Sequence, residues 1–333
     1  MIININKKLK KIMKNKLLLI NLIIFSFLYQ CDDAEGGVYQ NNPIADTFLS
    51  IEDLRSSLKP APYVETVDPS ATFSITGPGG TNITCTGNSI VDSNGNIVSD
   101  DVTISLNEFN TLDEMIFAKA PTTSNGNLLV TGGSFEVRAV NSLTNEELEF
   151  APWSCQCSLN IQTNPVGFEN QMMLYNGNTN NLDNNGQEVV DWDLQNQGEF
   201  TVFEGLFQAW GIDVGFSNCD VLYDMAGENG TQFEVTVSDV TDYTDNVEVW
   251  LIIDDFPSVV MITDVNSTPA LETYTGSIPQ GLNGTLVAIH IDDNNLLKFG
   301  SLEITVAGDD SFNVDVDYGT EEELVALVQS LVN

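Results

Sequence analysis

The sequence predicts an all-β protein, in which two β-sandwich units are joined by an irregular β-rich bridge and followed by a short C-terminal amphipathic helix. Val102, Ile104 and Leu106 alternate with polar residues, which is typical of a half-buried strand. Similar apolar and β-branched runs recur along the chain between Gly, Asn and Asp turns. Near the C-terminus, a capping box precedes apolar residues at helical spacing: Thr320 and Glu323, then Leu324, Leu327, Val328 and Leu331.

Residues 1–30 are predicted to be a signal peptide. Six lysines between Lys7 and Lys16 precede an apolar run, Leu17–Tyr29, that is broken only by Asn21 and Ser26. At about 1.5 Å per residue this run spans roughly 20 Å, which is short of the ~30 Å hydrocarbon core of a bilayer. The order of basic residues, apolar run and Cys31 therefore favours an export signal over a transmembrane helix.

The junction Leu28-Tyr29-Gln30-Cys31 resembles a lipoprotein signal, although Gln30 stands where a small residue is usual. Lipid attachment at Cys31 is the expectation, and an ordinary signal peptide with Cys31 as a free thiol is the alternative. Asp32 and Asp33 are similar to the acidic run after the lipidated cysteine of Bacteroidetes-type surface lipoproteins. That resemblance implies an outer-membrane protein, lipid-anchored at the cell surface.

The predicted mature chain is strongly acidic. Of the 11 Lys and Arg residues, six lie in the leader, so five remain against 48 Asp and Glu, and 5 − 48 gives −43. The five are Arg55, Lys59, Lys119, Arg138 and Lys298. Such a charge opposes nucleic acid and favours solubility, cations or basic partners. Nucleic-acid binding is excluded on this ground.

Four cysteines follow Cys31: Cys85, Cys155, Cys157 and Cys219. In an oxidising compartment they predict disulfides, for which three connectivities are possible. Only Gln156 separates Cys155 from Cys157, so pairing of each with a distant partner is favoured over a bridge between them. A four-thiolate metal site is the alternative, but the spacing and the single histidine do not suit structural zinc.

Residues 31–66 are predicted to form a flexible tether, because they are polar and irregular, with one short helix at residues 51–58. Residues 67–160 form the first predicted sandwich. Its clearest strands are expected at residues 73–76, 82–86, 101–107 and 134–140. Thr111 and Glu114 form a capping box that predicts a helix over residues 112–117.

Residues 161–225 are predicted to be the bridge, rich in Asn, Gly and aromatic residues. Residues 226–318 form the second predicted sandwich, of immunoglobulin or transthyretin type, and residues 319–333 form the C-terminal helix. The strands of the second sandwich are expected at residues 233–237, 247–253, 258–262, 285–292, 301–307 and 311–316.

The stretch from Ala71 to Phe150 resembles the ankyrin and netrin-receptor type of β-sandwich module in its Bacteroidetes lipoprotein version. The residues that carry this are GPGGTNITCTGNSIVDSNGNIVSDDVTISLNEF and TTSNGNLLVTGGSFEVRAV. MMLYNG, VDWDL and AWGIDVGFSNCDVLYD are similar to patches of the same proteins, followed by a transthyretin-like or immunoglobulin-like unit. The resemblance implies this architecture and a non-catalytic protein.

Two groups of residues could carry catalysis. His290 is the only histidine, and the alternation of Val287, Ile289 and Ile291 places it on the opposite face of a strand. No G-x-S-x-G elbow accompanies it, so a structural role is favoured over a catalytic triad. Asp191 and Asp193 flank Trp192 as in a glycosidase site, but a buried Trp192 between two solvated carboxylates is the preferred interpretation.

The sequence also contains a calcium-like loop and four tryptophans that could contact a glycan. The Asp92–Asn96 loop has its glycine too early for a calcium loop and favours an Asn-Gly turn. We predict no cofactor and no metal site, with weak calcium binding by the acidic surface as an option. Trp153, Trp192, Trp210 and Trp250 could stack on glycans, with Trp250 predicted to be core and Trp153 exposed.

The sequence therefore predicts a protein that is not an enzyme. It would be a lipid-anchored cell-surface protein for adhesion, assembly or binding of a protein or glycan ligand. The alternative is a lipoprotein that captures or processes glycans in a nutrient-uptake system. An exposed row of aromatic residues on one sheet face would favour this alternative.

Overall fold

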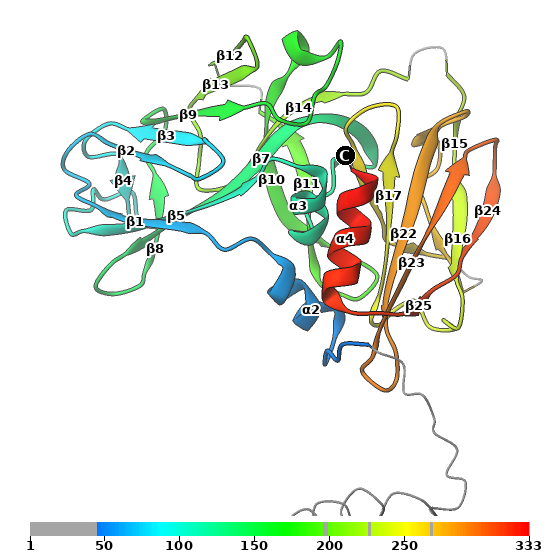
Figure 1. Cartoon of the computed structure of the whole chain (residues 1–333). Coiled ribbons are helices and arrows are strands. Elements are labelled where there is room, and N and C mark those ends of the chain that lie inside the picture. The colour runs from blue at the N-terminus through cyan, green and yellow to red at the C-terminus, as the bar shows by residue number, and fades with distance from the viewer. Residues whose placement is uncertain (1–44, 196–198, 226–227, 267–268, 333) are drawn as a thin grey trace, which may run out of the picture. The chain divides into compact units, whose positions relative to one another are not determined.

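The computed structural model describes residues 45–195, 199–225, 228–266 and 269–332 (Figure 1). These residues are mostly β-strand, arranged in several sheets and followed by a short C-terminal helix. The all-β prediction is therefore confirmed. Cys31 and the predicted leader lie outside the described residues. Within the described residues, no helix combines the length and the apolar character needed to cross a membrane.

One core lies between a nine-stranded and a five-stranded sheet. The longer sheet has the order β1 (Tyr63–Val67), β5 (Val102–Phe109), β7 (Asn127–Asn141), β14 (Gly215–Leu222), β10 (Met173–Leu182) and β11 (Glu188–Leu194), with β4 (Ile90–Val91), β6 (Thr123–Ser124) and β8 (Glu147–Phe150) beside it. The shorter sheet has the order β12 (Glu199–Phe203), β13 (Leu206–Trp210), β9 (Cys155–Asn160), β3 (Asn82–Cys85) and β2 (Phe73–Thr76). Alternate residues of both sheets fill this core, among them Ile104, Val137, Ile83 and Phe207.

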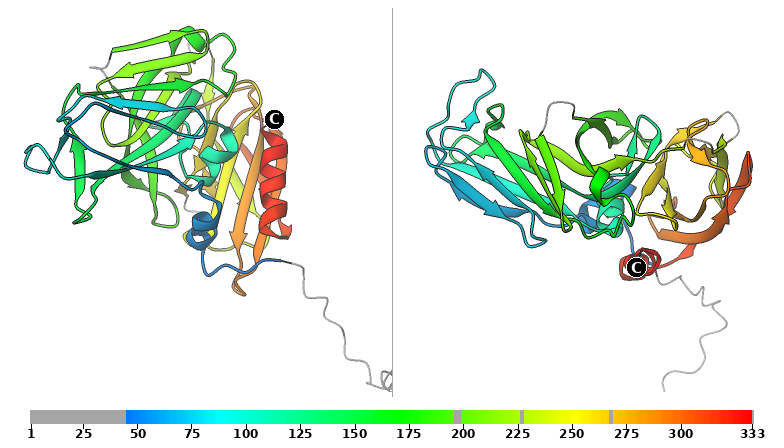
Figure 2. Two further views of the ribbon diagram at one scale, coloured as in Figure 1. Left: turned by 60° about the vertical axis from the view of Figure 1, so that its left-hand side comes forward. Right: turned by 90° about the horizontal axis from the view of Figure 1, so that it is seen from above.

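A second core lies between a five-stranded and a four-stranded sheet. The five-stranded sheet has the order β18 (Val259–Ile262), β17 (Val247–Ile253), β22 (Asn283–Ile291), β23 (Leu297–Thr305) and β25 (Asp317–Tyr318). The four-stranded sheet has the order β19 (Asp264–Val265), β20 (Leu271–Glu272), β16 (Phe233–Val237) and β24 (Asp310–Val314), and β15 (Gly230–Thr231) pairs with β21 (Ile278–Pro279). Viewed from above, the two β bodies lie side by side (Figure 2).

Strand β7 serves both cores. Its second half pairs with β5 and fills the first core, whereas Leu128 and Val130 pack into the second. Between the halves, Gly133 has a φ of +127°, a left-handed value that a side chain would resist. The register with β14 shifts at this point, so the strand bends from one body to the other.

Three helices cover the face of the β17–β22 sheet that lies away from the second core (Figure 2). They are α2 (Ile51–Leu58), α3 (Leu112–Phe117) and α4 (Glu321–Leu331). Both predicted capping boxes are present, at Thr111 and at Thr320. All three helices were predicted from the sequence, α2 and α3 with the bounds observed.

The expectation of a flexible tether up to residue 66 is wrong for its second half. Ile51 and Leu54 of α2 are buried against the helical layer, and β1 pairs with β5 along its whole length. The segment has a polar sequence because only one face of α2 packs against the rest of the protein, while its other face is exposed to solvent. Residues 161–225, the predicted bridge, supply β10, β11 and β14 to the nine-stranded sheet and β12 and β13 to the sheet that faces it.

A disulfide links two strands of the first sandwich. Cys85 on β3 is bonded to Cys155 on β9, directly opposite in the register. Cys157 and Cys219 are free thiols buried in the same core. Burial raises the pKa of the Cys157 thiol to about 12, so it remains protonated at neutral pH.

Candidate functional site

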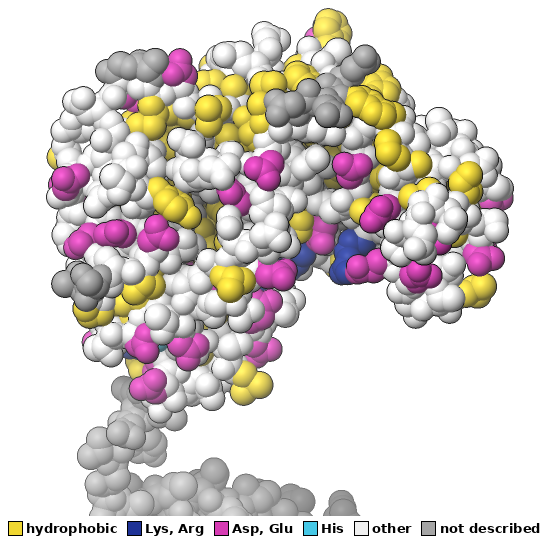
Figure 3. Space-filling model, turned by 180° about the vertical axis from the view of Figure 1, so that it is seen from behind, with side chains coloured by type: hydrophobic (Ala, Val, Ile, Leu, Met, Phe, Trp, Pro, Cys, Tyr) yellow, Lys and Arg dark blue, Asp and Glu magenta, His cyan; other side chains and the backbone are white. Residues whose placement is uncertain are grey.

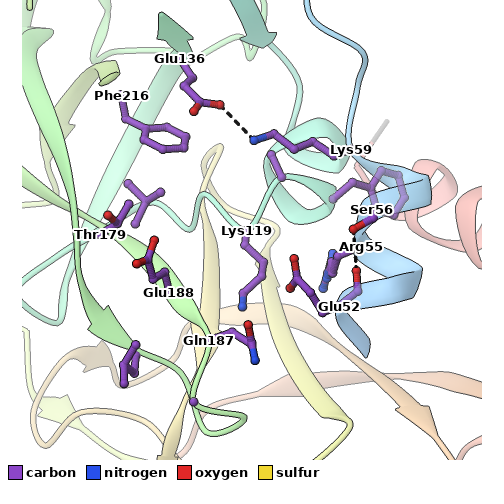
Figure 4. A pocket seen from close by; sticks show the side chains of 15 residues that line it. Glu52, Arg55, Ser56, Lys59, Lys119, Glu136, Thr179, Gln187, Glu188 and Phe216 are labelled. Atoms are coloured by element: carbon purple, nitrogen blue, oxygen red, sulfur yellow. Dashed lines mark hydrogen bonds and ion pairs between the residues drawn. The ribbon is translucent and has the colours of Figure 1, made fainter. Parts of the chain in front are cut away.

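A pocket of about 600 Å³ opens between α2, strands β7 and β14, and the turn that joins β10 to β11. Seen from behind, basic side chains lie in a hollow with carboxylates beside them (Figure 3). This is notable because the predicted mature chain has only five Lys and Arg residues. Three of them, Arg55, Lys59 and Lys119, line the pocket (Figure 4).

Arg55 is held at the inner wall by α2. Ser50 caps the helix by accepting from the backbone N–H of Asp53, and the helix then buries Arg55 to 3% exposure. The guanidinium forms an ion pair with Glu248 of β17 and donates from Nη1 to the Ile116 carbonyl at 2.6 Å. It also lies 5.4 Å from the centre of the Trp250 ring. Burial lowers the Arg55 pKa to about 9, and the carboxylates of Glu52 and Asp183 oppose this shift.

Lys59 closes the opposite end of the pocket. Its Nζ lies 3.0 Å from Glu136 Oε2 on β7. The same ammonium is 5.8 Å from the ring centre of Phe216 and 5.9 Å from that of Phe109. Phe216 is half-buried and is held by Phe109 and Trp192, each with its ring centre 6.3 Å away. The pocket therefore has an aromatic wall with a fixed orientation.

Lys119 forms the floor. It follows α3 with a φ of +54°, and its Nζ lies 2.8 Å from Asp183 Oδ2. Both side chains of this pair are buried, at 9% and 0% exposure. Asp183 also accepts from the backbone N–H groups of Asn185 and Gln187, which shapes the turn between β10 and β11. That turn carries Gln187 and Glu188 to the rim (Figure 4).

The pocket offers many hydrogen-bonding groups but no surplus of positive charge. Each of the three cations has a carboxylate partner, and no ion pair is found for the lining residues Glu52 and Glu188 within the described part of the chain. Five carboxylates against three cations give a local charge of −2. An anionic ligand would be repelled, whereas a neutral polar ligand could both accept and donate hydrogen bonds here.

No family model, curated protein or solved structure matched the chain. The resemblance to the ankyrin and netrin-receptor type of module thus stays a prediction. The chemistry of the site rests on its own geometry.

His290 and Trp192 both make hydrogen bonds to backbone carbonyls. His290 lies on β22 opposite Val247, and its Nδ1 lies 3.1 Å from the Asn246 carbonyl. Burial lowers the His290 pKa, which favours the neutral ring. Trp192 is fully buried and donates from Nε1 to the Pro121 carbonyl at 2.6 Å.

The two aspartates beside Trp192 differ in environment. Asp193 is exposed, as expected, but Asp191 is only 9% exposed. Its Oδ1 accepts from the backbone N–H of Asn125 at 3.0 Å, so the expectation that both carboxylates are solvated is wrong for Asp191. Strand β11 places Asp191 against the turn between β6 and β7, and the local sequence does not reveal this long-range contact.

The calcium-like loop is a turn. Asp92 Oδ1 accepts from the backbone N–H groups of Asn94 and Asn96, and Gly95 has a φ of +79°. Among the described residues, no group of three or more His, Cys, Asp or Glu side chains is placed to hold a metal ion. Weak calcium binding by the acidic surface remains a prediction.

The pocket residues were not singled out by the sequence, because they lie on five separate segments and form no motif. The sequence did contain one indication of the pocket: the predicted mature chain has only five basic residues, and three of them line it. The predicted environments of two tryptophans are confirmed, because Trp250 is buried and Trp153 is 55% exposed. Trp192 is also buried, and Trp210 is 37% exposed.

Proposed function

We propose that this chain is a non-catalytic surface protein that binds a neutral saccharide in the pocket between α2 and the β10–β11 turn. The observation that carries the proposal is the convergence of Arg55, Lys59 and Lys119 on one aromatic-walled pocket in so acidic a chain. Each cation is held by a carboxylate, so the pocket presents fixed donors and acceptors without an excess of positive charge.

The chemistry of a sugar fits these groups. Its hydroxyls each donate and accept, so they can bridge the ammonium and carboxylate of a pair such as Lys59 and Glu136, while Thr179 and Gln187 add further partners. The C–H face of the sugar can pack on the exposed part of Phe216. A volume of about 600 Å³ lies within the range of small-molecule sites and suits a short saccharide.

The test is calorimetric titration of the mature protein with methyl glycosides and disaccharides of glucose, galactose, mannose and N-acetylglucosamine. We expect binding of at least one, and a loss of about tenfold or more in affinity, about 1.4 kcal/mol, for Phe216→Ala and for Glu188→Gln. Because Glu188 is exposed, its substitution leaves the core intact.

Tyr318→Ala is the matched control, since Tyr318 is a 40% exposed aromatic on β25 outside the pocket. It should leave the affinity unchanged, and glucuronic acid should bind more weakly than glucose. The proposal is wrong if none of the neutral saccharides binds. It is equally wrong if both pocket variants bind as tightly as the wild type.

We also propose that a lipid on Cys31 holds this protein at the outer membrane, facing the cell surface. The support is the leader sequence, in which an apolar run too short to span a bilayer ends at Tyr29, one residue before the Gln30-Cys31 junction. Cys31→Ser should abolish incorporation of a radioactive fatty acid and release soluble protein. Undiminished labelling of this variant would contradict the anchor.

A further inference from the structure

The outer face of the β12–β13–β9–β3–β2 sheet has an unusual composition. Directly paired residues of antiparallel strands share a face, so the register defines its rows. One row runs from Trp210 through Gln156 and Thr84 to Ser74. The next consists of Thr201, Gln208, Ser158, Asn82 and Thr76. A third row, at the other end of the longer strands, consists of Phe203, Leu206 and Asn160.

Glu199 pairs with Trp210 at the edge of the first row and is the one charged residue of these rows; the other side chains are uncharged. They are amides, hydroxyls and a few apolar groups, all exposed or half-buried. The predicted mature chain has 48 carboxylates, and these rows hold one of them.

The polar side chains are ordered across the strands. Asn82 Nδ2 donates to Ser74 Oγ and to Thr76 Oγ1, both at 2.8 Å, and Thr84 Oγ1 donates to Asn82 Oδ1 at 3.0 Å. The Ser74 and Thr84 hydroxyls lie 2.9 Å apart. Neighbouring strands are about 4.8 Å apart, so the face repeats a donor and acceptor pattern at about the length of one sugar ring.

Two exposed tryptophans mark one end of the face. Trp210 is 37% exposed in its first row, and the 55% exposed Trp153 lies beside it in the fold. The Trp153 ring packs on Gly211, where an added Cβ would lie 2.9 Å from the ring. Trp153 itself has a φ of +63°, a strained value for a bulky residue that the surrounding structure must enforce.

The sheet beneath is rigid. The disulfide between Cys85 and Cys155 ties β3 to β9, directly under the polar rows. Ile83, Leu159 and Phe207 point inward from the same strands and are buried in the first core. A surface held in this way loses little conformational entropy when it binds.

We infer that this face binds an extended, neutral polysaccharide chain, which lies across the strands and stacks on Trp210. Amides and hydroxyls can both donate to and accept from sugar hydroxyls, and a face with a single charged residue at its edge suits an uncharged partner. The tryptophan supplies a stacking surface for one ring. This surface is separate from the pocket, so the inference does not depend on the proposed function.

The same observations disfavour the other occupants. A protein partner normally contributes an apolar interface centre, but the second, middle row of this face carries only amides and hydroxyls. Charged groups of a protein would lose water here without meeting an opposite charge. An anionic glycan or membrane surface would be repelled by the predicted charge of −43.

The experiment is sedimentation of the mature protein with insoluble cellulose, chitin, curdlan and mannan, alongside gel-electrophoretic retardation in soluble barley β-glucan, galactomannan and alginate. We expect retention by at least one neutral polysaccharide and none by alginate. Trp210→Ala should reduce that binding at least tenfold. Gln208→Glu, which adds a charge to the second row without touching the core, should also reduce it at least tenfold.

Two matched controls separate the face from general surface effects. Tyr63→Ala removes an aromatic residue with the same 37% exposure from the other sheet, and Gln171→Glu adds a charge at an exposed position outside both sheets. Both should bind as the wild type does, as should the pocket variant Glu188→Gln. The inference fails if no neutral polysaccharide is retained, or if Trp210→Ala and Gln208→Glu retain wild-type binding. Concentration-dependent dimerisation that Trp210→Ala abolishes would assign the face to a second copy of the chain and overturn the inference.

Discussion

Replacing Arg55 by methionine should lower the free energy of unfolding by about 3–5 kcal/mol. The side chain of Glu248 has 0% exposure and would be left as a buried carboxylate without its cation. Trp250 would still donate from Nε1 to Glu248 Oε2 at 3.1 Å, but a single neutral donor does not offset the loss of the ion pair. Urea denaturation followed by tryptophan fluorescence measures the change.

The exposed pair of Arg138 and Glu147 provides the control. Its side chains are 62% and 76% exposed, so Arg138→Met should cost no more than about 1 kcal/mol. The double variant Arg55→Met with Glu248→Leu should recover most of the lost stability, because it removes both buried charges. If Arg55→Met proved as mild as Arg138→Met, the buried carboxylate of Glu248 would not depend on Arg55 for its compensation.

Replacing Asp220 by asparagine should stabilise the protein at neutral pH. Asp220 lies on β14 with 0% exposure, and burial raises the pKa of its carboxyl well above the usual range. Its Oδ2 accepts from Asn218 at 2.6 Å, while Oδ1 has no hydrogen-bond partner among the described residues. An asparagine side chain can still accept from Asn218 and carries no charge for burial to destabilise.

The sign of the pH dependence follows from this raised pKa. The folded state keeps the Asp220 proton to a higher pH than the unfolded state, whose pKa is about 3.9. The contribution of Asp220 to the free energy of unfolding is therefore fully present below about pH 4. It decreases by about 1.4 kcal/mol per pH unit as the pH rises towards the folded-state pKa.

The advantage of Asp220→Asn should accordingly grow between pH 4 and pH 7, as measured by urea denaturation at each pH. Asp193→Asn is the control, because Asp193 is an exposed aspartate on β11, two strands from β14 in the same sheet, and its substitution removes no buried carboxyl. An Asp220→Asn effect of the same size at every pH would show that this carboxyl does not titrate differently on folding.

Local structure was predictable where neighbouring residues determine it. Ser50 and the amphipathic spacing determine α2, and capping boxes determine α3 and α4. Strands such as Phe73–Thr76, Phe233–Val237 and Val247–Ile253 have the predicted bounds, because their alternation or continuous burial is visible in the letters.

The arrangement of these elements was not predictable, since it depends on distant pairings. Strand β14 lies between β7 and β10, and Arg55 meets Glu248 from a segment that looked like a tether. The pocket exists only through such contacts. The outer face of the β12–β13–β9–β3–β2 sheet was partly predictable, because polar residues alternate along its strands. The register that aligns these residues in rows is set only in the folded sheet.

The chain enters the folded body beside the turn that joins β22 to β23. There, the Phe48 N–H donates to the Asn295 carbonyl at 3.0 Å and the Leu297 N–H donates to the Asp46 carbonyl at 2.9 Å. A pulling force applied through the N-terminus therefore loads these backbone hydrogen bonds first and the ion pair of Arg55 next. Under such a force, α2 is expected to detach from the β17–β22 sheet before either sandwich opens.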